Sequence, residues 1–227
     1  MNARSINNNP SVWNKKSMDS IKVASLNCAR LEPHIEDVWH DFKLKKADII
    51  HMQETWVMDG SDTLPLGYPE KGYREQFVNV GPGKGLVTYY NEKFRHERDV
   101  KTDTFQITKF TSKNMDSINM YRSQNGNLSN VCDCLTGLIN TDKTTIITGD
   151  FNLCSVMKGN NKITSYLKAL GFKQYVIGPT HIAGGHLDHL YMRQGGDQAV
   201  TINAERYSPY YSDHDGVLTT VSFPDKE

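Results

Sequence analysis

The chain has 227 residues and a mass of 25.7 kDa, and its residues are 37% hydrophobic and 23% charged. This is ordinary globular composition, so it excludes collagen-like, wholly disordered and disulfide-scaffold proteins and predicts one domain. The 26 basic and 26 acidic residues cancel, so no chain-wide field predicts nucleic-acid binding, and any such binding must be local.

The sequence offers no segment for membrane insertion. No stretch approaches the roughly 20 apolar residues of a span, and residues 1–20 lack the apolar core of a secretory signal. The four cysteines, Cys28, Cys132, Cys134 and Cys154, are irregularly spaced, which predicts reduced thiols rather than a disulfide framework. We therefore expect an intracellular protein without membrane contacts.

Secondary structure is expected after a flexible leader at residues 1–20, with a single domain over 21–227. Apolar residues on both faces of 21–27 predict a buried strand ending at Asn27. Pro33 suits the first turn of a helix in which Ile35, Val38 and Phe42 recur at helical spacing. Further strands are expected at 47–52, 73–80, 84–90, 105–111, 118–121, 144–148, 187–192, 199–203 and 216–223, and helices at 128–139 and 163–170.

Many strands and few helices, both scattered along the chain, predict an α/β fold of two packed sheets with helices on their outer faces. Gly171 is expected to cap the helix at 163–170. The Gly-rich string at 81–85 looks like a phosphate-binding loop but lacks the Lys-Ser/Thr ending and leads into a strand. It is therefore predicted to be a hairpin turn.

Polar side chains stand where apolar strand runs stop and turns begin. Such residues are Glu54, Asp150, Asn152, Asp188 and the pair Asp213-His214. Each one alone is more simply explained as a cap or turn residue. Together they predict acidic and imidazole groups that converge at one rim, where functional sites are commonly built.

Six short motifs occur in order and together resemble the endonuclease/exonuclease/phosphatase superfamily. They are SLN at 25–27, QET at 53–55, MY at 120–121, TGDFN at 148–152, LDH at 187–189 and SDH at 212–214. The resemblance covers about residues 21–223. Within the superfamily the chain looks most like the apurinic-endonuclease-like domains of LINE-type retrotransposons and Helitron-type transposons, partly through the segment GPTHIAGGHLDHLY from Gly178.

This resemblance implies a four-layer α/β/β/α sandwich of two mostly antiparallel sheets. It also implies a phosphoesterase that depends on Mg²⁺ or Mn²⁺ and nicks one DNA strand, leaving a 3′-hydroxyl. Glu54 would bind the metal directly, because a hard cation prefers carboxylate oxygen, and Asn27 and Asp213 would be nearby ligands.

The remaining motif residues would act on the phosphate and on water. The resemblance implies that Asp150 orients or deprotonates the attacking water and that Asn152 holds that water or a phosphate oxygen. His214 would stabilise the charge that develops on phosphorus oxygens, and Asp188 would hold its imidazolium in place. These four residues form the expected catalytic set together with Tyr121.

Tyr121 distinguishes branches of the superfamily. The corresponding strand ends in an Asn-Thr-His type string in lipid-directed branches and in a tyrosine in nucleases, which favours a nucleic-acid substrate here. A phenol at this place could donate to the phosphate or, if ionised, act as a base. Alternatively, Tyr121 has no catalytic role and is simply a packed tyrosine at a strand end with its hydroxyl exposed.

Several residues beside the motifs are candidates for substrate binding: Arg30, Arg122, Asn125, Trp56 and Tyr211. Ala29 stands where related sequences carry Asp or Asn, and Arg30 could compensate by touching phosphate. The string from Tyr121 lacks the usual proline, so either Gln124 or Asn125 could reach the backbone. Arg74, Lys84, Tyr207 and Tyr210 are weaker candidates for a DNA groove.

The histidines His181, His186 and His189 invite a zinc-site interpretation because they cluster near Asp188. We disfavour it, since their spacing is irregular for a tetrahedral site and the resemblance places only Asp188 in the site.

The expected partner is duplex DNA, contacted along its backbone by a monomer that is fused to, or acts with, other mobile-element domains. A nuclear location rests on the resemblance alone. Two alternatives stay open: a related phosphoesterase that acts on abasic sites, RNA 3′ ends or small phosphate esters, and a silent module that binds nucleic acid or protein.

Overall fold

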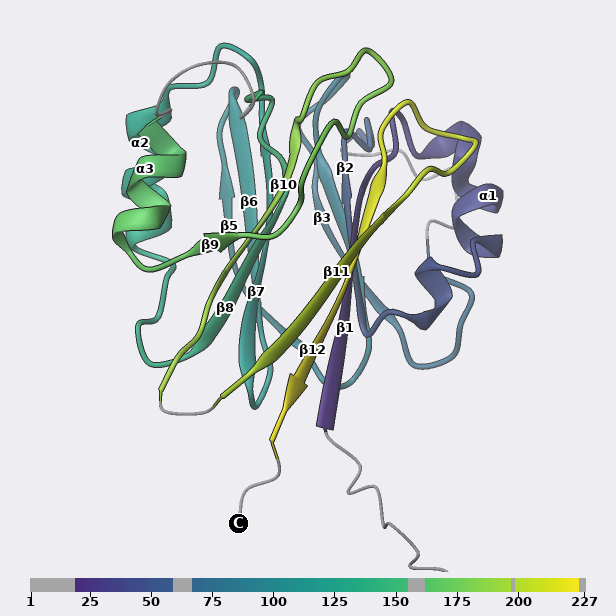
Figure 1. The fold of residues 1–227 in the computed structure, drawn as a ribbon. Coiled ribbons are helices and arrows are strands. Elements are labelled where there is room, and N and C mark those ends of the chain that lie inside the picture. Colours follow the sequence, from purple (N-terminus) through teal and green to yellow (C-terminus); the bar gives the residue numbers. More distant parts are fainter. Residues whose placement is uncertain (1–18, 59–66, 155–161, 197–198, 225–227) are drawn as a thin grey trace, which may run out of the picture.

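The computed structural model describes residues 19–58, 67–154, 162–196 and 199–224. Two six-stranded sheets pack face to face, and helices cover the outer face of each, which gives four layers (Figure 1). The predicted α/β/β/α sandwich is therefore confirmed. Most of the predicted leader lies outside the described residues, and the first strand already begins at Asp19, two residues earlier than expected.

The first sheet has the order β11-β12-β1-β2-β4-β3. Its central strands β1 and β2 are parallel, and its other neighbours are antiparallel. The crossover between β1 and β2 carries α1 (Ile35–His40), with single 3₁₀ turns at Glu32–His34 and Leu44–Lys46. The strands are β1 (Asp19–Asn27), β2 (Ile49–Gln53), β3 (Arg74–Val78), β4 (Leu86–Tyr90), β11 (Thr201–Tyr207) and β12 (Gly216–Phe223).

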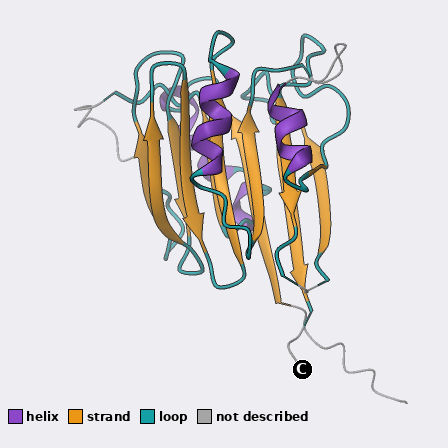
Figure 2. Cartoon of the chain, turned by 90° about the vertical axis from the view of Figure 1, so that its left-hand side faces the viewer, coloured by secondary structure: helices purple, strands orange, loops and turns teal. Residues whose placement is uncertain are grey.

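The second sheet repeats this plan in the order β5-β6-β7-β8-β10-β9, with β7 and β8 as its parallel pair. Its outer face is covered by α2 (Leu128–Thr136) and α3 (Lys162–Ala169), which lie in front of the strands in Figure 2. The strands are β5 (Arg95–Lys101), β6 (Phe105–Thr111), β7 (Met115–Arg122), β8 (Thr144–Asp150), β9 (Lys173–Gln174) and β10 (Asp188–Arg193).

Some local expectations are confirmed and others are wrong. Gly171 ends α3 with a positive φ of 84°, and residues 79–85 join β3 to β4 as a hairpin, both as predicted. The sequence pattern missed β5 and β9, because β5 is a polar edge strand without alternation and β9 is only two residues long. Helix α1 ends at His40, and Phe42 is 64% exposed instead of continuing the helical stripe.

The structure also bears on the expectations about membrane-spanning helices and cysteines. None of the helices in the described part of the chain is long and apolar enough to span a bilayer. Cys28, Cys132 and Cys134 are free thiols, as expected.

A buried polar layer joins the two sheets. The His51 ring lies on β2 and hydrogen-bonds Ser117 Oγ on β7 through Nε2 (2.7 Å) and Thr88 Oγ1 through Nδ1 (3.1 Å). Two residues further along β2, Gln53 Nε2 donates to Asn119 Oδ1 on β7 at 2.7 Å. Since alternate residues of a strand share one face, these contacts fix the register of one sheet against the other.

His51 should make stability depend on pH. Burial lowers the pKa of His51 to about 3, whereas in the unfolded chain its pKa should be near the ordinary value of 6.5. The unfolded state therefore binds more protons between these values, and the free energy of unfolding falls as pH drops below about 6.5. Chemical denaturation at pH 5.0–6.5 should show a flatter pH dependence for His51→Gln than for the wild type. Equal slopes would contradict a buried neutral imidazole.

Candidate active site

The carboxyl ends of both parallel strand pairs meet at one end of the sandwich, the upper end in Figure 1. Asn27 ends β1, Glu54 follows β2, and Tyr121 lies opposite Asp150 at the ends of β7 and β8. The antiparallel strand β10 begins there with Asp188, paired with Asp150. Strand topology alone thus brings most of the predicted site residues together.

Asp150 is fully buried at the centre of this end. Its Oδ2 accepts from the side-chain amides of Asn27 and Asn152, both at 3.0 Å, and its Oδ1 accepts from the Asn152 backbone N–H at 2.8 Å. Burial raises the pKa of the Asp150 carboxyl, and the negative charge of Asp188 raises it further. The carboxylate is therefore held in place and has a stronger affinity for a proton than an exposed one.

Gly149 explains why a glycine precedes Asp150. Its φ is 138°, and a Cβ at this position would lie 1.9 Å from the Met120 carbonyl oxygen of β7. Only glycine allows β7 and β8 to approach this closely, so it sets the position of the Asp150 backbone.

His214 and Asp188 form a buried pair. The Nδ1 atom of His214 lies 2.8 Å from Asp188 Oδ2, so the Asp188 carboxylate occupies Nδ1 and does not occupy Nε2. Burial alone would lower the pKa of His214, but the hydrogen bond to Asp188 and the charges of Asp188, Asp150 and Asp213 outweigh it and raise the pKa to about 9. The ring is therefore an imidazolium at neutral pH. Ser212 Oγ accepts the His214 N–H at 3.0 Å and donates to the Asn27 carbonyl at 2.6 Å, which ties this loop to β1.

The Tyr121 phenol lies beside the Glu54 carboxylate. The Tyr121 hydroxyl donates to the Gly83 carbonyl at 2.9 Å, in the hairpin loop after β3. Burial raises the pKa of Tyr121, and the carboxylates of Glu54 and Asp150 raise it further. The phenol is thus a protonated hydrogen-bond donor beside Glu54.

The donor set fits a hard divalent cation. Glu54 and Asp188 both act on Asp150 as like charges, since each raises the pKa of Asp150. Within the described chain, the only ion pair that any of the three forms is the one between Asp188 and His214. Glu54 is half-buried, and its carboxylate is close enough to Tyr121 and Asp150 to raise the pKa of both, so a cation held by oxygen ligands would relieve the repulsion.

Backbone strain is concentrated at this end of the molecule. Among the described residues, the non-glycine residues with positive φ are Ala29, Arg30, Glu54, Trp56 and Asn152. All of them follow the strands that supply the site. Left-handed conformations cost non-glycine residues about 1–2 kcal/mol each, and such strain clusters at functional sites.

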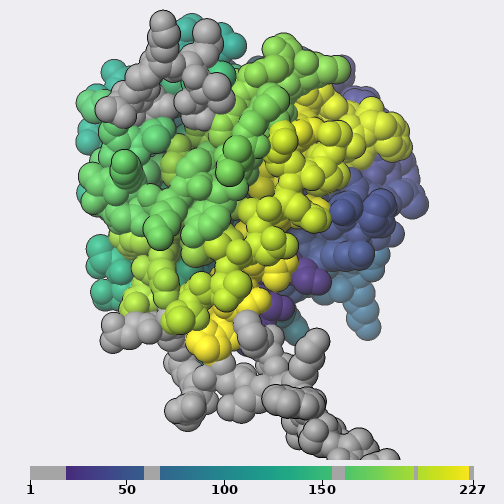
Figure 3. Space-filling view, viewed as in Figure 1, coloured from purple at the N-terminus to yellow at the C-terminus, as the bar shows by residue number. Residues whose placement is uncertain are grey.

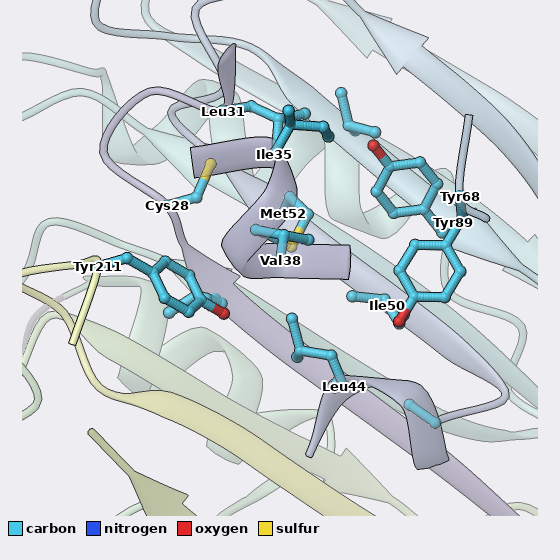
Figure 4. Packing of buried hydrophobic residues seen from close by; sticks show 14 of the residues in the cluster. Cys28, Leu31, Ile35, Val38, Leu44, Ile50, Met52, Tyr68, Tyr89 and Tyr211 are labelled. Carbon is cyan, nitrogen blue, oxygen red and sulfur yellow. The ribbon is translucent and has the colours of Figure 1, made fainter. Parts of the chain in front are cut away.

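Two of the predicted substrate-binding residues have structural roles instead. Arg122 is 2% exposed, and its guanidinium donates to four backbone carbonyls, those of Phe151, Asn152, Gln124 and Gly126. Tyr211 is 6% exposed, and its hydroxyl donates to Asp41 at 2.7 Å. Figure 4 shows Tyr211 in the hydrophobic cluster that also contains Cys28 and Leu44. We therefore leave both out of the substrate-binding set.

The other three candidates lie at the rim. Arg30 and Asn125 are exposed, and Trp56 is 38% exposed, with its backbone N–H donating to the Lys84 carbonyl at 2.9 Å. Arg30 makes an ion pair only with Glu32, at 3.7 Å, within the described chain. All three side chains are therefore accessible to solvent at the strand ends.

The three clustered histidines do not form one metal site. His189 is buried, stacks on Phe151 with ring centroids 4.7 Å apart, and bonds the Leu153 carbonyl at 2.9 Å. His181 instead lies beside Asp213, with Nε2 3.3 Å from the carboxylate. A nitrogen of His181, a nitrogen of His214 and an oxygen of Asp213 lie within 4.8 Å of one another.

Sequence reasoning missed His181 as a neighbour of the catalytic pair and missed the Gly83 carbonyl as the partner of Tyr121. His181 precedes the LDH motif by several residues, and only the pairing of two loops brings it to His214. Tyr121 bonds the backbone carbonyl of Gly83, and because every residue has such a carbonyl, the sequence gives no indication of this contact.

No protein-family model matches the chain, and no curated protein matches it in sequence. Solved structures do share its fold. The endonuclease domain of TRAS1, a telomere-specific non-LTR retrotransposon, has a TM-score of 0.67 and 14% identity over 89% of this chain and 98% of that domain. An AP endonuclease from Archaeoglobus fulgidus has a TM-score of 0.62 and 16% identity over 88% of this chain and 98% of its own.

An endonuclease/exonuclease/phosphatase family protein from Leptotrichia buccalis has a TM-score of 0.65 and 15% identity, covering 90% of this chain and 100% of that one. At such low identity the likeness concerns the fold. The chain therefore has the endonuclease/exonuclease/phosphatase fold, as the sequence motifs predicted.

The strain at Arg30 can be measured. Its φ of 91° suits glycine, so Arg30→Gly should raise the free energy of unfolding by about 0.5–1 kcal/mol after the greater freedom of glycine in the unfolded chain is subtracted. Urea denaturation measures this. The control Arg98→Gly, an exposed arginine of β5 without positive φ, should lower stability. A loss of stability at Arg30 as large as at Arg98 would show that the backbone there is unstrained.

Proposed function

We propose that this protein is a divalent-metal-dependent endonuclease that hydrolyses a phosphodiester bond of DNA and leaves a nick with a 3′-hydroxyl. The observation that carries the proposal is the convergence of Asp150, held by two amides, with the buried Asp188–His214 pair at one end of the sandwich. The fold likeness to a retrotransposon endonuclease domain and an AP endonuclease supports a nuclease of mobile-element origin.

Glu54 would hold Mg²⁺ or Mn²⁺, with Asn27 and Asp213 as further ligands or as partners of metal-bound water. The bound ion would neutralise negative charge on the phosphate. Asn27 Oδ1 accepts the Ala29 N–H at 3.0 Å, and no second donor to this oxygen lies among the described residues, which leaves one lone pair for a ligand.

Asp150 and Asn152 would prepare the attacking water. The Asp150 carboxylate is fixed by three hydrogen bonds, and its raised pKa makes it a better proton acceptor than an exposed carboxylate. Asn152 has φ of 47° and is itself tied to the Arg122 carbonyl at 3.0 Å, so its amide is rigidly placed. Arg122 thus contributes to this site by bracing the loop and not by touching substrate.

His214 would stabilise the phosphate in the transition state. Since Asp188 takes Nδ1, the Nε2–H of the imidazolium is the donor left for a phosphoryl oxygen. Tyr121, a protonated phenol, would be a second donor once substrate displaces its bond to Gly83. This favours the donor role over the base role that the sequence left open.

Arg30, Asn125 and Trp56 would contact the DNA backbone from the rim. Because the chain is neutral overall, few phosphate contacts are available, and binding to duplex should be weak, with a shallow dependence on salt concentration. Targeting by attached mobile-element domains in the nucleus would compensate for this.

A supercoiled-plasmid assay tests the function. With Mg²⁺ the wild type should convert supercoiled plasmid to nicked circle, and EDTA should abolish this. Glu54→Gln, Asp150→Asn and His214→Ala should each lower the rate by at least about 100-fold, the usual scale for such groups. Asp142→Asn, an exposed carboxylate after α2, is the matched control and should nick at the wild-type rate.

Retained nicking in all three site variants, with their fold verified by circular dichroism, would end the assignment. The same proteins should be tested on an abasic duplex, poly(A) and an inositol phosphate, because relative rates on these substrates separate the related phosphoesterase activities. DNA binding without cleavage in any metal would favour the silent module.

A further inference from the structure

The loop before β10 and the loop before β12 are joined beside the catalytic pair. His181 and His214 form a backbone bridge, the Ile182 N–H donates to the Asp213 carbonyl at 3.0 Å, and the Asp215 N–H donates to the Thr180 carbonyl at 2.7 Å. Figure 3 shows these two segments, green and yellow, side by side on one face of the molecule. His181 is therefore fixed against the loop that carries Asp213 and His214.

Hydrogen bonding defines the tautomer of His181. The Ala183 backbone N–H donates to His181 Nδ1 at 3.0 Å, so this nitrogen carries a lone pair. In the neutral ring the proton then lies on Nε2, which is 3.3 Å from Asp213 Oδ2. The ring also packs edge-on against the His214 ring, with centroids 4.7 Å apart.

This tautomer argues against a metal site at His181, Asp213 and His214, although their ligand atoms lie within 4.8 Å. A metal on Nε2 would require the ring proton to move to Nδ1, where it would face the Ala183 N–H. Metal-binding histidines instead donate their other N–H to an acceptor. The surroundings of His181 are those of a hydrogen-bond donor.

Asp213 needs such a donor. Its side chain is 49% exposed, and His181 is the only side chain that bonds its carboxylate within the described residues. An exposed carboxylate without a partner would sample several rotamers, and ordering it costs conformational entropy. The contact with His181 keeps the carboxylate beside the His214 ring.

We propose that His181 is a positioning residue of the nuclease site, whose Nε2–H holds the Asp213 carboxylate in place next to His214. This rests on the proposed function. The residue acts through Asp213 and does not itself touch the phosphate.

Three substitutions separate the two ring nitrogens. Glutamine can place an amide N–H near the Nε2 position, asparagine can supply only the Nδ1 acceptor, and alanine supplies neither. His181→Ala and His181→Asn should lower kcat about 10- to 100-fold, the scale of a misplaced catalytic group. His181→Gln should restore most of the loss, and KM for plasmid should change little in all three. A large rise in KM at constant kcat would show a direct substrate contact and overturn the proposal.

A double-mutant cycle tests whether His181 acts through Asp213. In single-turnover nicking, His181→Ala should cost much less in an Asp213→Ala background than in the wild type. An equal cost in both backgrounds would overturn the proposal.

Two measurements do not depend on activity. Nitrogen NMR of the imidazole rings should show His181 as the neutral Nε2–H tautomer, and the Nδ1–H tautomer would contradict the proposal. Titration of metal-free protein with Zn²⁺ should show no tight site that His181→Gln removes; finding one would establish the metal site instead. If the wild type does not nick DNA, the proposed function fails. The NMR and Zn²⁺ measurements would still test whether His181 Nε2–H is a hydrogen-bond donor and not a metal ligand.

Discussion

Repulsion among carboxylates that the fold holds close together is the interaction on which the site depends. Asp150 is wholly buried, Asp188 is nearly so, and Glu54 is close enough to raise the pKa of Asp150. Each unfavourable charge has an opposing contact: amides of Asn27 and Asn152 for Asp150, and the imidazolium of His214 for Asp188. Glu54 has the Tyr121 hydroxyl beside it but forms no ion pair among the described residues, and that imbalance in charge is what makes the site suited to a cation.

The sandwich creates this crowding through its topology. Each sheet carries one parallel pair in its middle, and both pairs end at the same end of the molecule, so residues that lie far apart in sequence become neighbours. The buried layer of His51, Gln53 and Asn119 then locks one sheet against the other directly beneath the site. Glycine at 149 and the left-handed residues at the strand ends complete the placement. Rigid support of this kind is what preorganised catalysis requires.

The sequence predicted the parts of this arrangement that residue type and period encode. Alternation gave the central strands, and polar residues at their ends gave Glu54, Asp150 and Asp188 as neighbours. It could not predict β5, whose polar edge lacks alternation, nor the fate of Arg122, because the carbonyls it binds come from a loop that returns from elsewhere. Tyr211 was misassigned for a similar reason, since its partner Asp41 is 170 positions away.

Diffraction from crystals soaked in Mn²⁺ would show whether Glu54 binds the metal, since the anomalous signal of manganese locates the ion without reference to activity. We expect a peak in contact with the Glu54 carboxylate, on the side of Asn27 and Asp150. A peak confined to His181, Asp213 and His214, or none near Glu54 at saturating Mn²⁺, would contradict it.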